Sequence, residues 1–61
     1  MDELGLITVR EAAQRLTVSR RTVARLLASR ELPHVRIGRA VRVREVDVAE
    51  FIRRHYRRRA A

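Results

Sequence analysis

Two short amphipathic segments, separated by three residues, constrain the fold of this chain more than any other feature of its sequence. The first opens with a capping box, TVRE at residues 8–11, in which the Thr8 hydroxyl accepts from a first-turn amide and Glu11 reaches back to the cap. The apolar residues that follow at helical spacing are Val9, Ala12, Ala13 and Leu16. We therefore expect a helix that starts after Thr8 and buries this face.

The second segment begins at Ser19, a residue type that caps helix N-termini well. The apolar residues behind it at helical spacing are Val23, Leu26 and Leu27. Pro33 stops any further helix and disfavours a helical backbone at the residue before it. The sequence therefore predicts a second helix from about Arg20 to Ser29.

After Pro33 the periodicity changes from helical to alternating, because VRIGRAVRV at residues 35–43 interleaves apolar residues with arginines. Two short strands joined around residues 38–40 fit this pattern. One face of the hairpin is expected to hold Val35, Ile37, Val41 and Val43. The opposite face is expected to hold Arg36 and Arg42.

A final helix is predicted from roughly Glu45 to Arg57. Its residues at apolar helical spacing are Val48, Phe51, Ile52 and His55. Asp47 and Glu50 fall early in this helix and arginines fall late, which suits the helix dipole.

Two short helices separated by residues 17–19 match a helix-turn-helix, whose second helix enters the major groove of DNA. Ala12 and Ala13 are small enough for the second helix to cross closely over the first, and Val18 is expected to fill the turn. The hairpin adds a wing. We expect one mainly α domain over residues 1–61, ordered helix, helix, hairpin, helix, with a core at about 6–56 and a basic tail at 57–61.

Fifteen arginines and no lysine oppose seven acidic residues, giving a formal net charge of +8. A charge this large on one small domain indicates a polyanionic partner. GC-rich coding also enriches arginine, and a helix face rich in arginine is often merely solvated. Because the second helix and the wing both carry arginines, we expect duplex DNA as the partner. The predicted DNA-binding residues are Ser19, Arg20, Arg21, Thr22 and Arg25 on the second helix, and Arg36, Gly38, Arg39 and Arg42 on the wing.

Individual roles follow from position. The first turns of the second helix reach base edges, and its free amides attract phosphate. Thr22 suits a packing or capping role as well as base contact. Gly38 allows an unusual backbone at the wing tip, and Arg39 would project towards the adjacent minor groove or phosphates. The run Arg57 to Arg59 fits either a solvated tail or a phosphate clamp without sequence preference.

Other functions find less support in the residues. The chain has no cysteine, and its two histidines, His34 and His55, have no nearby pair of ligands, so we expect no metal, no cofactor and no enzyme activity. Asp47 and Glu50 are better explained as first-turn acids than as a catalytic pair. No apolar run approaches the ~20 residues of a membrane span, and MDEL at residues 1–4 lacks the basic region of a signal peptide, so a cytoplasmic protein is expected.

Two further partners stay open as alternatives. The arginine-rich final helix resembles helices that bind anionic membranes, but its short apolar face is needed for the core. RNA readers usually stack bases on exposed aromatic side chains. Phe51 and Tyr56 are the only aromatic residues other than histidine, and both lie in the last helix.

Taken together, residues 6–52 resemble the excisionase-type, MerR-related winged helix-turn-helix family. The motifs that carry this resemblance are LITVREAAQRL, VSRRTVARLL, LPHVRIGRAVRV and DVAEFI. Three positions depart from the common pattern: Arg30 stands where a helix-ending glycine is frequent, Ala24 replaces an aromatic residue, and Ala40-Val41 lacks the aromatic residue often found after the wing turn.

The resemblance implies two related roles. An excisionase binds several sites near an attachment site, bends the DNA and directs a partner integrase towards excision. A small transcriptional regulator binds promoters instead, often as head-to-tail arrays. A chain of 61 residues has no room for an effector domain or a dimerising coiled coil, which favours the architectural role at the nucleoid of a bacterial host.

Overall fold

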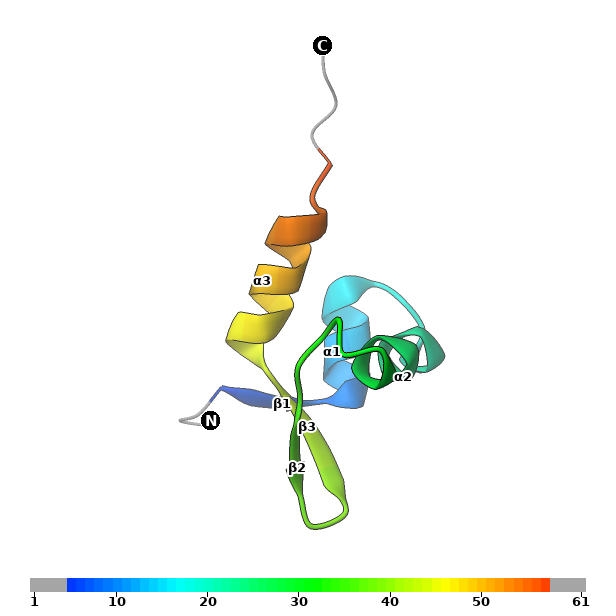
Figure 1. Cartoon of the computed structure of the whole chain (residues 1–61), viewed down its shortest axis with the longest axis vertical. Coiled ribbons are helices and arrows are strands. Elements are labelled where there is room, and N and C mark those ends of the chain that lie inside the picture. Colours follow the sequence, from blue (N-terminus) through cyan, green and yellow to red (C-terminus); the bar gives the residue numbers. More distant parts are fainter. Residues whose placement is uncertain (1–4, 58–61) are drawn as a thin grey trace.

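A computed structural model describes residues 5–57 of the chain. The acidic start MDEL, and Arg58 and Arg59 of the basic tail, lie outside the described residues. The elements are β1 (Leu6–Thr8), α1 (Val9–Leu16), α2 (Arg20–Ala28), β2 (Val35–Ile37), β3 (Ala40–Arg44) and α3 (Glu45–His55) (Figure 1). This mainly helical fold with a small hairpin confirms the predicted winged helix-turn-helix.

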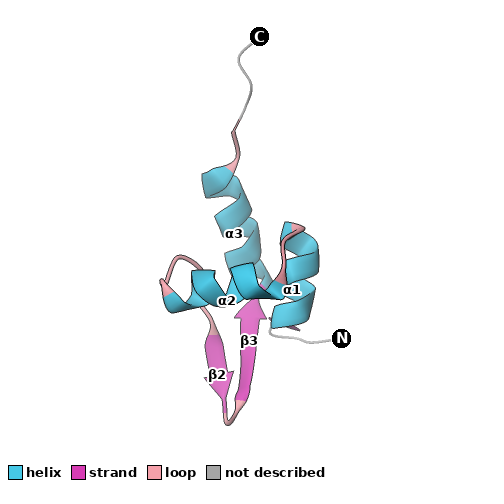
Figure 2. Ribbon diagram, turned by 90° about the vertical axis from the view of Figure 1, so that its right-hand side faces the viewer, coloured by secondary structure: helices cyan, strands magenta, loops and turns pink. Residues whose placement is uncertain are grey.

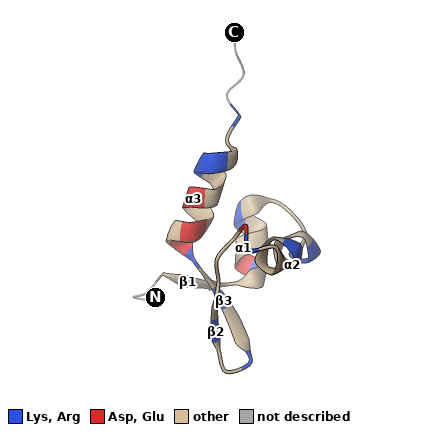
Figure 3. Cartoon of the chain, in the orientation of Figure 1, with Lys and Arg blue, Asp and Glu red and all other residues tan. Residues whose placement is uncertain are grey.

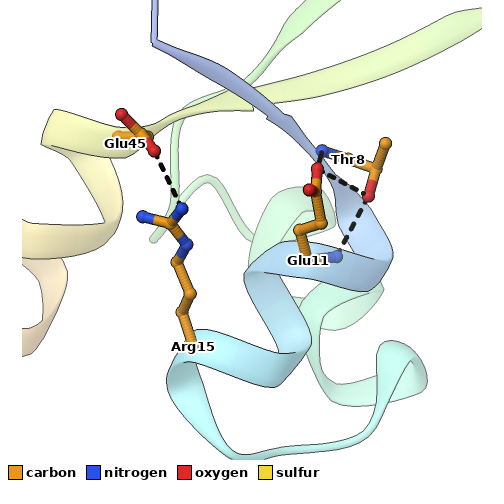
Figure 4. Close-up of polar contacts among 4 residues, drawn as sticks. All are labelled: Thr8, Glu11, Arg15 and Glu45. Carbon is orange, nitrogen blue, oxygen red and sulfur yellow. Dashed lines mark hydrogen bonds and ion pairs between the residues drawn. The ribbon is translucent and has the colours of Figure 1, made fainter. Parts of the chain in front are cut away.

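Both predicted N-caps form. The Thr8 hydroxyl accepts a hydrogen bond from the Glu11 amide at 3.0 Å, and Glu11 Oε1 accepts from the Thr8 amide at 2.9 Å, which completes the capping box (Figure 4). The pKa of the Glu11 carboxyl is lowered below its ordinary value, first by the hydrogen bond from the Thr8 amide and then by a second one from the Thr8 hydroxyl, which donates to Glu11 Oε1 at 3.2 Å. Ser19 Oγ accepts from the Thr22 amide at 3.1 Å and caps α2 in the same way.

Both helices of the pair end on a left-handed residue that is not glycine. Thr17 has a φ of 58° after α1, and Arg30 has a φ of 67° after α2. In each case the next amide reaches back to a carbonyl of the last turn, with Val18 N to Ala13 O at 3.0 Å and Glu31 N to Leu26 O at 3.0 Å. These are Schellman-type ends. A β-carbon at such a position is strained, as the unusual arginine at residue 30 suggested.

The core is small and lies between the helices and the sheet. Its buried residues are Ile7, Ala12, Ala13, Val23, Leu32, Val43 and Val48. Leu32 is fully buried although sequence patterns did not predict it, because the left-handed turn at Arg30 redirects the chain inward after α2. The expectation that Val18 fills the turn is wrong, since this side chain is 39% exposed.

The sheet contains a strand that sequence analysis missed. Its order is β1-β3-β2 and both pairings are antiparallel. Ile7 of β1 lies opposite Val43 of β3, and both are buried against the helices. The residues before the first helix therefore contribute to the core, and α1 starts directly from the sheet.

The predicted distribution of side chains on the hairpin is wrong. The strands are joined by a two-residue turn, Gly38 and Arg39, so that Ile37 pairs with Ala40 and Arg36 with Val41. Arg36 thus shares a face with its cross-strand partner Val41. Arg42 shares the other face with its own partner, Val35. A loop one residue shorter than expected moves one strand's side chains to the opposite face. As a result Ile37 is 56% exposed.

The last helix is shorter and less buried than predicted. It ends at His55, before Arg57. Val48 is buried and Phe51 packs against the core, but Ile52 and His55, which share the apolar helical spacing, are exposed, Ile52 to 44%. His55 instead stacks on Phe51 with ring centroids 4.0 Å apart.

We predict that Arg30→Gly stabilises the protein by about 0.5–1 kcal/mol, because glycine adopts the left-handed conformation without a β-carbon clash. Urea unfolding followed by circular dichroism measures the change. Arg30→Ala is the matched control, since it removes the same charge but keeps the β-carbon, and it should not stabilise. Equal stability of the two variants would contradict the assignment of strain to this residue.

Candidate nucleic-acid interface

The crossing of α1 and α2 fixes which side of α2 is free. Ala12 of α1 and Val23 of α2 have no exposed surface, so small and β-branched side chains pack together in the core there. Figure 2 shows α2 lying across the molecule above the β2–β3 hairpin, which projects beyond the helices. The outer side of α2 and the end of the hairpin are therefore both free of the rest of the fold.

The first turn of α2 carries positive charge that its own helix does not compensate. Arg20 and Arg21 are the first two residues of α2, both are exposed, and this turn contains no acidic residue. Positive side chains at a helix N-terminus oppose the helix dipole and the free amides there. Such an arrangement lowers the stability of the free protein and favours an anionic ligand at that end.

The arginines of α2 are also unpaired. Within residues 5–57, no ion pair or hydrogen bond involves the side chains of Arg20, Arg21 or Arg25. Because an exposed arginine side chain without an internal partner keeps all of its donors, these three are free to bind phosphates or base edges.

Ser19 and Thr22 already have partners in the free protein. Besides capping the helix, Ser19 Oγ lies 3.0 Å from Thr22 Oγ1, and the Thr22 side chain is half-buried. Both residues therefore build the start of α2. Their contact with DNA stays a prediction. Thr22 takes part in the cap as the partner of Ser19, because both its amide and its hydroxyl bind Ser19 Oγ.

The wing residues separate into two groups. Gly38 has a φ of 61° at the first position of the turn, where a type II′ hairpin requires a positive φ, and Arg39 beside it is exposed. Arg36 is also exposed near this end. Arg42 differs, because it is half-buried, donates to the Val41 carbonyl at 2.9 Å and acts electrostatically on Glu11. The structure thus brings Arg36 and Arg39 to the wing end and leaves Arg42 closer to α1.

The acidic residues of α3 have arginine partners of their own. Arg15 of α1 pairs with Glu45 at 2.8 Å (Figure 4), and Arg44 makes two contacts with Asp47, at 2.7 and 3.0 Å. Glu50 lies 3.4 Å from Arg53. Figure 3 shows acidic residues in the first part of α3, basic residues at its C-terminal end, and further basic residues at α2 and at the end of the hairpin. The charge of the fold is therefore unevenly distributed, and α2 with the wing is its free basic side.

Further unpaired arginines within residues 5–57 were not among the predicted site residues. Arg10 on α1 and Arg30 after α2 are exposed and have no ion pair within the described chain. Sequence patterns placed Arg10 on the outer face of the first helix, but they gave no reason to separate it from Arg15, which binds Glu45.

No metal site or membrane span emerges from residues 5–57. They contain no group of three or more His, Cys, Asp or Glu side chains placed to hold a metal ion. Among these residues, no helix is long and apolar enough to cross a membrane. A surface hollow at the end of α2 is lined by Leu27, Ala28, Arg30, Leu32, Pro33 and His34.

A helix pair with a tight turn, a hairpin wing and a free basic face defines the class of winged helix-turn-helix proteins. The profile of a helix-turn-helix domain family matches residues 6–56, and the chain belongs to that family.

Two curated proteins of Mycobacterium tuberculosis, from strains CDC 1551 / Oshkosh and ATCC 25618 / H37Rv, are similar to this chain. Each is named "Putative DNA-binding protein", is 43% identical over 51 residues and aligns with 84% of this chain. The chain spans 65% of the length of these relatives. No solved structure matches the chain.

We predict that Arg20→Glu stabilises the free protein, and that its free energy of unfolding exceeds that of Arg39→Glu by about 0.5–1 kcal/mol. Both variants change the net charge equally, but only the first reverses an unfavourable charge at a helix N-terminus. Urea unfolding at low ionic strength gives both free energies, and added salt should reduce the difference. If Arg20→Glu is the less stable variant, Arg20 contributes to the fold in a way that its exposure does not show.

Proposed function

We propose that this protein is a sequence-specific binder of duplex DNA. The observation that carries the proposal is the unpaired, exposed set of arginines at the start of α2, at a helix N-terminus without any first-turn acid. With α2 in the major groove, Arg20, Arg21 and Arg25 would read base edges, because guanidinium groups form paired hydrogen bonds with guanine. Ser19 and Thr22 would fix the start of the helix against the backbone.

The wing would contact the same duplex beside α2. Arg36 and Arg39 are exposed near the hairpin end, and Gly38 supplies the turn that exposes them. Narrow minor grooves have an enhanced negative potential that attracts arginine. Arg42, which is half-buried, would contribute a phosphate contact close to the body of the domain.

For the biological role, we propose an excisionase-type architectural protein that binds tandem sites, bends DNA and directs an integrase towards excision. It would act in the bacterial cytoplasm, at the nucleoid. Support comes from the motifs shared with that family and from α2 and the wing, which together would hold consecutive grooves of one curved duplex. One such module buries about 600–1,000 Å² on DNA, so neighbouring copies in head-to-tail contact would supply the remaining specificity.

A small transcriptional regulator of the same family is the alternative role. It would use the same surface of α2 and the wing, so contact residues do not separate the two. The regulator needs neither an integrase nor a bend that grows with each bound copy. Bending and stoichiometry therefore discriminate between them.

We predict that Arg21→Ala costs about 1–3 kcal/mol on the preferred sequence and little on random DNA. The preferred sequence is first selected from a random duplex library, and binding is then measured by fluorescence anisotropy against salt. Neutralising about six phosphates gives a slope of log affinity against log salt near −5. Arg53→Ala, which changes a 74% exposed arginine on α3, is the control. It should change neither the affinity for the preferred sequence nor the salt slope.

Two results would count against this account. If the affinity of the wild-type protein did not change with salt concentration, binding of DNA through its arginines would be ruled out. An equal loss on preferred and random duplexes for Arg21→Ala would make Arg21 a phosphate contact and leave base reading to other residues.

We predict stepwise complexes on tandem sites in circular-permutation gel shifts, each bound copy adding to the bend, while the free protein sediments as a monomer. This follows because copies that contact each other head to tail need no symmetric interface and do not have to close. A single unbent complex on the same DNA would contradict the architectural role and favour the regulator.

A further inference from the structure

Ile37 is an apolar side chain with no place in the core. It is the last residue of β2, directly before the turn, and it is 56% exposed. The register pairs it with Ala40, on the face of the sheet that points away from buried Val43. It is not among the partly buried residues that pack against the core. The two-residue turn therefore exposes a large β-branched side chain at the end of the wing.

The surroundings of Ile37 are basic. Arg36 precedes it on the opposite face of the ribbon, and Arg39 follows it at the turn. Both are exposed and have no ion pair within the described part of the chain. The end of the wing thus combines two free guanidinium groups with one exposed aliphatic side chain.

Charge limits what can cover this side chain. A second copy that brought its own wing to this position would place further unpaired arginines against Arg36 and Arg39, and like charges repel. Duplex DNA offers phosphates for the arginines and apolar sugar and base edges for the aliphatic group.

We propose that Ile37 contacts DNA from the wing as an apolar wedge in the minor groove and contributes to bending of the duplex. This inference rests on the proposed function. Apolar side chains that enter the minor groove separate base steps and kink the duplex by about 20–90°. Arg36 and Arg39 hold the ribbon to the phosphates on either side, and Ile37 supplies the contact that requires a deformed groove. The wing then contributes shape selectivity as well as charge.

The test compares Ile37→Thr with Val46→Thr on the selected duplex. Both changes replace a β-branched apolar side chain by threonine, and Val46 is 63% exposed on α3, away from the wing. Affinity is measured by anisotropy against salt, and the bend by energy transfer between dyes at the duplex ends. Melting temperatures verify that each variant is folded.

We expect Ile37→Thr to bind about fivefold more weakly, the effect of losing part of an isoleucine's burial, and to bend the duplex less. Its salt slope should equal that of the wild type, because no charge is lost. Arg39→Gln removes a charge, so it should reduce the salt slope by about one. Ile37→Leu, which keeps an apolar side chain of the same size, and Val46→Thr should both match the wild type.

Wild-type affinity and bend in Ile37→Thr would overturn the wedge while leaving DNA binding intact. Unchanged affinity for a single site with a loss of the stepwise complexes on tandem sites would also overturn it, and would assign Ile37 to contact between copies. A wild-type protein that fails to bind any duplex would overturn the proposed function and the wedge together.

Discussion

The close crossing of α1 and α2 is the contact on which the rest of the structure depends. Ala12 and Val23 are completely buried there, and Ala13 is nearly so. A domain of this size buries only about 60% of the surface that its unfolded chain exposes, so its core contains few side chains. Each of them therefore also serves to orient an element. With Val23 turned inward, Arg20, Arg21 and Arg25 lie on exposed positions of the same short helix.

The second principle of the molecule is its division of charge. Acidic residues of α3 pair with arginines of β3, α1 and α3 itself, so these arginines already have partners and are less available to bind a ligand. Surface ion pairs of this kind contribute little to stability, about 0–1 kcal/mol each. Their larger consequence is spatial, because they leave unpaired arginine on α2 and on the wing. A polyanion approaching the protein then meets its strongest attraction on that side.

Much of the fold followed from local sequence rules. The capping box at Thr8, the cap at Ser19 and the alternation after Pro33 gave the helix starts and the hairpin, since these signals act within a few residues. Features set by tertiary contact did not follow. Strand β1 is three residues long and exists through pairing with β3. Burial of Leu32 depends on the left-handed residue before it.

The candidate site was predictable to a similar degree. Exposure of the arginines on α2 followed from helical periodicity, whereas the hairpin faces depended on a loop length that alternation alone does not fix. Glycine at residue 38 fits either loop length. Nor did the sequence reveal that Arg42 is half-buried and acts on Glu11, or that Ser19 holds the Thr22 hydroxyl. Those partners are brought together by folding.

The central claim is that α2 and the wing form one surface for duplex DNA, and that α3, whose acidic residues are paired with arginines, takes no part. Titration of ¹⁵N-labelled protein with the selected duplex, followed through backbone amide and arginine Nε–H resonances, tests it most directly. The account predicts the largest shifts at residues 19–25 and 36–40, and small shifts at residues 46–52. Shifts concentrated on α3, with α2 and the wing unaffected, would contradict it.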